Sequence, residues 1–274
     1  MNHYIKLVNF EVKRFSKLFL SLIVAVVAAQ IIGAIITSLH YVSNAEKTMV
    51  REQLTVSDYI QNYSAYSLQN FLYSEYFILS IAFAAAVLMI YVFFIWYRDW
   101  LGKSSVIYRL LMLPTARRNV YFAKLTTILL LVFGLLGMQI ILLEVVKRVI
   151  RLIVPEQFYF DPSDIYFYSS EVLQILYPNS LLQFIFYYGL GATLVAIIFT
   201  AVLFERSYQL KGIFFAIIYI VISVIIIIIP VIIQIITDYF YLNEIVLMTI
   251  GSSILAIALA VYLADHLLNR KINV

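Results

Sequence analysis

Residues 101–105, with the letters LGKSS, end like the phosphate-binding loop of an ATPase. In that loop a first glycine stands five positions before the glycine of the Gly-Lys-Ser tail, and backbone amides between them cradle the phosphates. In this sequence Tyr97 stands five positions before Gly102, so the loop is incomplete. We therefore predict that the chain does not hydrolyse ATP itself and holds no cofactor.

Residues for other catalytic chemistry are also missing. The chain has no Cys, and its three histidines, His3, His40 and His266, lie far apart without a His-Glu-x-x-His motif. No Gly-x-Ser-x-Gly turn is present to carry a serine nucleophile. We predict no catalytic site and no metal site, and we do not expect the chain to be an enzyme.

Most of the chain is apolar: 64% of its residues are hydrophobic and 12% are charged. The apolar residues form blocks about 20 residues long, enough for a helix to cross a hydrocarbon core of about 30 Å. The six blocks cover residues 18–39, 77–97, 125–146, 181–204, 212–236 and 245–263. The sequence therefore predicts an all-α, polytopic membrane protein, with six transmembrane helices in one domain of residues 1–274.

Lys and Arg indicate the orientation of these helices. With the N-terminus inside, fourteen of the 19 Lys and Arg residues fall on the inner side. The outer ones are Lys47, Arg51, Lys147, Arg148 and Arg151. Because cytoplasmic loops carry the excess of positive residues, both termini are predicted to be cytoplasmic. The formal net charge of +4 is thus a topology signal, and we expect no nucleic-acid partner.

The first 17 residues predict an amphipathic helix in the inner membrane interface. At about 100 degrees per residue, Lys6, Lys13 and Lys17 fall on one side of this helix and apolar residues cover the other. Glu11 interrupts the apolar side. Such a helix would place its lysines at lipid headgroups before turning into the first transmembrane helix. A plain basic anchor is the alternative.

The inner connection between the second and third blocks, residues 98–124, contains a further short helix. Ser104 or Ser105 would cap this helix, and Pro114 would end it. The apolar residues of this piece are Val106, Ile107, Leu110, Leu111 and Leu113. A loop surrounded by water does not expose such a surface, so the bilayer or a partner protein must cover it.

The apolar blocks hold few residues suited to ion-coupled transport. Such transporters place ionisable groups at mid-membrane. Glu144 is the one charged residue within a block, and Lys147 and Arg148 follow one helical turn later, so an interfacial ion pair accounts for it. Pro230 lies inside the fifth block, where it could produce a packing bend or a hinge for transport.

Uncharged polar residues recur within the blocks. Gln30, Gln139 and Ser223 are examples, and glycines accompany them. Such residues favour close packing of transmembrane helices, and a conduit lined by some of them is the alternative.

Six helices, inner termini, an amphipathic N-terminal helix and the segment YRLLMLPTARRNVYFAKL at residues 108–125 together resemble the permease subunits of bacterial type-2 ATP-binding-cassette (ABC) exporters. The run LLMLPTARR is similar to that family's leucine-rich helix, proline and basic residues. The resemblance implies a cytoplasmic coupling helix between the second and third transmembrane helices, docked on a separate ATPase that binds the ATP. By this resemblance the ATPase groove would take Val106, Tyr108, Leu110, Leu111 and Leu113. Its carboxylates or lipid phosphates would pair with Arg109, Arg117 and Arg118.

The same resemblance implies an exporter in the bacterial cytoplasmic membrane. It would work with a second permease copy or a sister permease, in contact with membrane lipid. It would move a hydrophobic or amphipathic substrate, either lipid-like or an antimicrobial or toxin-like peptide. The alternative is a non-transporting immunity or sensor protein that binds a peptide through outer residues, which include Tyr59, Tyr63, Tyr66, Tyr159 and Tyr166 to Tyr168.

Overall fold

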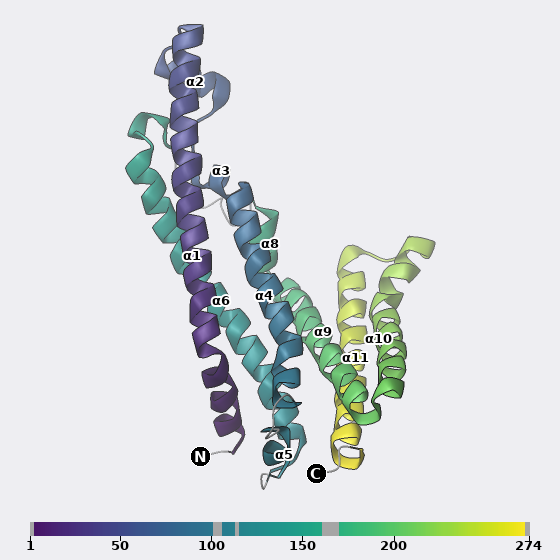
Figure 1. Ribbon diagram of the computed structural model, residues 1–274. Helices are drawn as coiled ribbons and strands as arrows, with labels where there is room; N and C mark the ends of the chain where they lie inside the picture. The colour runs from purple at the N-terminus through teal and green to yellow at the C-terminus, as the bar shows by residue number, and fades with distance from the viewer. Residues whose placement is uncertain (1–2, 101–105, 113–114, 161–169, 272–274) are drawn as a thin grey trace. The chain divides into compact units, whose positions relative to one another are not determined.

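The computed structural model describes residues 3–100, 106–112, 115–160 and 170–271. Six helices in these ranges are long and apolar enough to cross a membrane. They are α1 (His3–Glu52), α4 (Glu75–Trp100), α6 (Arg118–Ile153), α9 (Leu181–Tyr208), α10 (Leu210–Thr237) and α11 (Leu242–Arg270), all labelled in Figure 1. Each helix contains one of the apolar blocks, which confirms the prediction of a helical protein with six candidate membrane spans.

Short elements occupy the longer connections. They are α2 (Val56–Tyr63), α3 (Leu68–Leu72), α5 (Val106–Leu111), the 3-10 helix η1 (Glu156–Phe158) and α8 (Glu171–Leu176). The capping box of α2 shows why the sequence starts a helix there. The hydroxyl of Thr55 accepts from the amide of Asp58, and the carboxylate of Asp58 accepts from the amide of Thr55.

The N-terminal segment differs from the prediction in its connection to the first transmembrane helix. The backbone of α1 is helical without a break from His3 to Glu52, so no turn separates residues 3–17 from the apolar block. The physical reason lies in the sequence, because residues 3–32 contain neither proline nor glycine to end a helix.

The helices divide into two compact units. Unit 1 consists of Met1–Phe15, Leu88–Leu130 and Asn179–Val274, and unit 2 consists of Ser16–Val87 and Leu131–Pro178. The chain passes between the units within α1, α4 and α6, so each of these helices contributes a segment to both.

Helices α9, α10 and α11 of unit 1 approach each other closely through small side chains. Ala196, Ala216 and Ala260 are buried in one apolar cluster. The hydroxyl of Thr200 in α9 donates to the carbonyl of Ala260 in α11 at 3.1 Å. Small residues and interhelical hydrogen bonds are the usual means of packing helices in lipid, where no hydrophobic force drives association.

Two tight turns connect these helices. Gln209 joins α9 to α10 with a φ of 53°, and Asp238 ends α10 with a φ of 47°. The amide of Asp238 donates to the carbonyl of Gln234 at 2.8 Å, which satisfies a carbonyl in the last turn of α10. The connection between α10 and α11 is therefore short, from Asp238 to Tyr241. Pro230 is buried inside α10, whose helical backbone continues on both sides, and its role as a hinge stays a prediction.

Unit 2 contains a buried amide pair between α1 and α6. Gln30 and Gln139 donate to each other's side-chain carbonyls at 3.0 and 2.9 Å, and Gln30 also donates to the hydroxyl of Ser80 in α4 at 2.9 Å. All three side chains are buried. These two glutamines therefore join packed helices and do not line a conduit.

We predict that Gln139→Leu lowers the free energy of unfolding by about 1 kcal/mol, the typical size of an interhelical hydrogen bond in a membrane. The loss arises because Gln30 keeps only its bond to Ser80. Denaturant unfolding in detergent micelles measures it. The double variant Gln30→Leu/Gln139→Leu should lose less than the sum of the single losses, and additive losses would argue against the pair.

Aromatic residues fill the part of unit 2 beyond the apolar blocks. Tyr41 lies 4.8 Å from Tyr66 between ring centroids, and Tyr59 meets Phe158 edge-on at 6.0 Å. The amide of Tyr66 donates to the carbonyl of Phe158 at 2.8 Å, which links the connection before α3 to the end of η1. Burial raises the pKa of the Tyr66 hydroxyl, so it stays protonated and donates to Thr37 at 3.0 Å.

Candidate functional site

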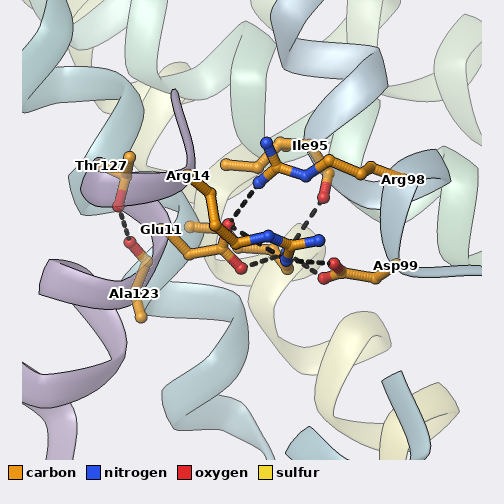
Figure 2. Close-up of polar contacts among 8 residues, drawn as sticks. Glu11, Arg14, Ile95, Arg98, Asp99, Ala123 and Thr127 are labelled. Atoms are coloured by element: carbon orange, nitrogen blue, oxygen red, sulfur yellow. Dashed lines mark hydrogen bonds and ion pairs between the residues drawn. The ribbon is translucent and has the colours of Figure 1, made fainter. Parts of the chain in front are cut away.

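Five charged side chains meet in unit 1, close to the N-terminal end of α1. They are Glu11 and Arg14 of α1, Arg98 and Asp99 of α4, and Lys124 of α6. Figure 2 shows Glu11, Arg14, Arg98 and Asp99 turned toward one another. We call these five residues the charge cluster.

Lys124 is the centre of the charge cluster. Its Nζ lies 2.7 Å from Oε1 of Glu11, 2.5 Å from Oδ2 of Asp99 and 3.0 Å from the carbonyl oxygen of Ile95. These three acceptors use all three N–H donors of the ammonium group. The ring of Trp96 lies 5.1 Å from Nζ, a distance at which the face of an indole attracts a cation. Lys124 is thus buried but fully paired.

The two arginines complete the pairing of the carboxylates. Arg98 donates from Nη2 to Oε2 of Glu11 at 2.8 Å. Arg14 donates from Nη1 to Oδ1 of Asp99 at 2.6 Å. The arginine side chains are 21% and 17% exposed for Arg14 and Arg98, whereas those of Lys124, Asp99 and Glu11 are at most 3% exposed. The two arginines therefore lie between solvent and the buried carboxylates.

The charge cluster links the three helices α1, α4 and α6. Its three cations and two carboxylates sum to a formal charge of +1. Buried ions are costly, and they persist only when each finds partners of opposite charge. Each carboxylate here binds cations from two other sequence segments, so the cluster fixes the relation of α1, α4 and α6 within unit 1. Such buried charges often have a functional role in membrane proteins.

Helix α5 lies at the end of unit 1 where α1 begins and α11 ends (Figure 1). Leu110 of α5 is buried in an apolar cluster with Leu7 of α1 and with Val120 and Ala123 of α6. The opposite side of α5 is open to solvent, where the side chain of Tyr108 is 41% exposed. The helix thus has one face fixed to the chain and one face available to a partner.

The structure separates the residues predicted to contact an ATPase into two groups. Leu110 and Leu111 are buried, and Val106 packs partly buried in the same cluster as Leu110. Tyr108 and Arg109 are exposed. The apolar surface of α5, which we expected the bilayer or a partner to cover, is therefore covered largely by the chain itself, because the N-terminal segment of α1 packs on α5.

The remaining residues of this prediction lie around the start of α6. Arg118 is exposed, and Arg117 donates from Nη1 to the carbonyl oxygen of Leu268 at 2.6 Å. Leu113, Pro114 and the motif at residues 101–105 lie outside the described residues. Arg117 therefore ties the start of α6 to α11, and Arg118 is the more accessible arginine.

The lysines predicted to anchor the N-terminal helix are all exposed. Lys6, Lys13 and Lys17 share one side of α1, and Leu7 and Phe15 on the other side are buried. Glu11, which interrupts the apolar side in the sequence, is 2% exposed because it binds Arg98 and Lys124. The exception in the periodicity thus belongs to the charge cluster.

Sequence reasoning missed the charge cluster as a unit. Arg98 and Lys124 counted only as positive loop residues. The available signal was the pair of acids, Glu11 and Asp99, close to the inner ends of apolar blocks where bases are expected. The sequence around each acid does not identify its partner, because Lys124 lies 113 residues from Glu11 along the chain.

Of the tyrosines in the alternative hypothesis, the structure describes Tyr59, Tyr63, Tyr66 and Tyr159, and two of these four are buried. Tyr59 and Tyr66 are buried at 5% and 3% exposure and form part of the core of unit 2. Tyr159 is half-buried, and Tyr166 to Tyr168 lie outside the described residues. Tyr63 is 47% exposed and donates to the carboxylate of Glu52 at 3.0 Å. Among the described tyrosines of this hypothesis, Tyr63 is therefore the most accessible to a peptide.

No protein-family model matches this chain, and no curated protein or solved structure matches it either. Across the described ranges, no three His, Asp or Glu side chains gather so as to hold a metal ion.

Proposed function

We propose that the chain is the transmembrane subunit of a bacterial ABC exporter, and that a separate ATPase docks on α5. The observation that carries this proposal is the arrangement of α5. Leu110 is fixed against α1 and α6, while Tyr108 and Arg109 are exposed. A short helix held in this way is suited to pass movement from a soluble partner to the spanning helices.

The chemistry of the exposed face of α5 defines the partner surface. Arg109, together with Arg118 at the start of α6, offers guanidinium groups that bind carboxylates in bidentate fashion. Tyr108 and Met112, 41% and 70% exposed, offer apolar contact area beside them. We therefore propose an apolar groove rimmed by carboxylates on the ATPase. The partner binds and hydrolyses ATP, and this chain holds no cofactor.

In this proposal α5 and both termini are cytoplasmic, in a bacterial cell membrane. The excess of Lys and Arg at this end supports that orientation. The exposed Lys6, Lys13 and Lys17 would contact lipid headgroups at the inner interface.

The transported substrate in this proposal is hydrophobic or amphipathic, most simply an antimicrobial or toxin-like peptide. A second permease copy or a sister permease completes the transporter, and Pro230 serves as a hinge in α10. The rival function is a non-transporting immunity or sensor protein that binds a peptide through its outer segments, which include the exposed Tyr63. The two functions differ in one respect that is simple to measure, the presence of an ATPase partner.

Purification of the tagged chain from its native membrane tests the proposal. We expect a nucleotide-binding protein to accompany the chain in stoichiometric amount, and the eluate to hydrolyse ATP. Mass spectrometry identifies the partner. A pure six-helix protein without ATPase activity would contradict the exporter function and favour the rival.

We predict that Arg109→Glu reduces the yield of the accompanying ATPase at least about tenfold, which corresponds to a loss of about 1.4 kcal/mol in binding. The reversed charge would face the carboxylates that Arg109 is proposed to bind. Lys211→Glu, with the same charge change on an exposed residue of α10, is the control and should leave the yield unchanged. Equal yields from both variants would refute docking through Arg109.

A further inference from the structure

The contact between α1 and α6 in unit 1 has two layers. Leu7 and Glu11 stand four residues apart on α1, and Val120 and Lys124 stand four residues apart on α6. Residues four apart lie on the same face of a helix. Each helix therefore presents an apolar residue and a charged residue to the other, one turn apart.

Helix α5 rests on the apolar layer. Leu110 packs in the cluster formed by Leu7, Val120 and Ala123, while the ion pair between Glu11 and Lys124, 2.7 Å long, forms the next layer. A further bond between the hydroxyls of Tyr4 and Thr126, 2.5 Å long, joins the same two helices. The apolar surface on which α5 packs is thus formed by α1 and α6, which the ion pair and the Tyr4–Thr126 bond join.

We propose that Glu11 and Lys124 are positioning residues that hold α5, and with it the exposed Tyr108 and Arg109, in a fixed orientation. Lys124 also binds Asp99 and the carbonyl of Ile95 in α4. A displacement of α5 is therefore transmitted to α1, α4 and α6 together. That α5 receives a docked ATPase rests on the proposed function above, whereas its positioning by the ion pair does not.

Spin labelling of the isolated chain tests the positioning. The natural chain has no Cys, so Met112→Cys provides a single labelling site. Met112 is 70% exposed and continues the last turn of α5, because its amide donates to the carbonyl of Tyr108 at 3.0 Å. We expect the spin label at position 112 to have a shorter rotational correlation time in Glu11→Gln, because α5 is held less rigidly. Glu11→Asp, which keeps the charge but shortens its reach, should shift this time in the same direction and serves if Glu11→Gln does not fold.

Two further variants make the result specific. Gln139→Leu removes hydrogen bonds between α1 and α6 within unit 2. It should leave the rotational correlation time of the label unchanged. Leu7→Ala, which removes an apolar contact beneath α5, should mobilise the label as Glu11→Gln does. An immobile label in both Glu11 variants, or an equal shift in Gln139→Leu, would overturn the proposal. Because no ATPase is present, this outcome is independent of the purification that tests the exporter function.

Discussion

Replacement of Lys124 by methionine is expected to lower the free energy of unfolding by about 2–3 kcal/mol, in the range of a hydrogen bond to a charged group. Lys124 is the cation that Glu11 and Asp99 share, at 2.7 and 2.5 Å. Without it, Glu11 retains Arg98 and Asp99 retains Arg14. Methionine fills much of the space of the lysine stem, so the loss would reflect charge more than volume. Denaturant unfolding in detergent micelles gives the value.

The matched control for this substitution is Lys211→Met, because Lys211 is an exposed lysine of α10. It should change the stability by no more than about 0.5 kcal/mol, as is usual for surface substitutions. The combination of Lys124→Met with Glu11→Gln should cost less than the sum of the two single losses, because they remove the same interaction. If Lys124→Met unfolds like the control, the charge cluster does not hold the helices as described.

The second large effect is expected for Gly212→Ala, which should destabilise the chain by about 1–3 kcal/mol through overpacking. A Cβ atom at Gly212 would stand 2.2 Å from the carbonyl oxygen of Phe204 and 2.8 Å from Cα of Glu205. Both are backbone atoms of α9, so relief requires the turn between α9 and α10 to open. That turn already contains Gln209 at a positive φ.

Gly251→Ala in α11 is the control for Gly212→Ala. Apart from the neighbouring backbone of α11, no atom of the described residues lies within 4 Å of a Cβ at this position. Alanine should therefore stabilise the helix by up to about 1 kcal/mol through its higher helix propensity. Thermal unfolding of both variants in the same detergent compares them. The packing described for the α9–α10 turn would be refuted if Gly212→Ala were as stable as Gly251→Ala.

The spanning helices could be predicted from sequence because each depends on local properties. An apolar block about 20 residues long has few alternatives to a membrane helix, and every block lies inside one observed helix. The boundaries were less predictable. α1 extends to Glu52 and α6 to Ile153, well beyond the apolar residues, because nothing in those segments stops a helix.

The charge cluster could not be predicted because it depends on packing between distant segments. Glu11, Asp99 and Lys124 each look like interfacial charges when read alone, and only the packing of α1, α4 and α6 makes them partners. The burial of Leu110 has the same origin. The apolar surface of α5 was recognised from its composition, but that Leu7 and Val120 cover it follows from the tertiary fold.

The most direct measurement of the docking proposal is photocrosslinking in the native membrane from position 108. A benzophenone amino acid in place of Tyr108 would stand on the exposed face of α5. We expect irradiation to produce one main crosslinked protein, identified by mass spectrometry as a nucleotide-binding ATPase, and we expect Arg109→Glu to remove it. Crosslinks to lipid alone would contradict the proposal that an ATPase docks on α5.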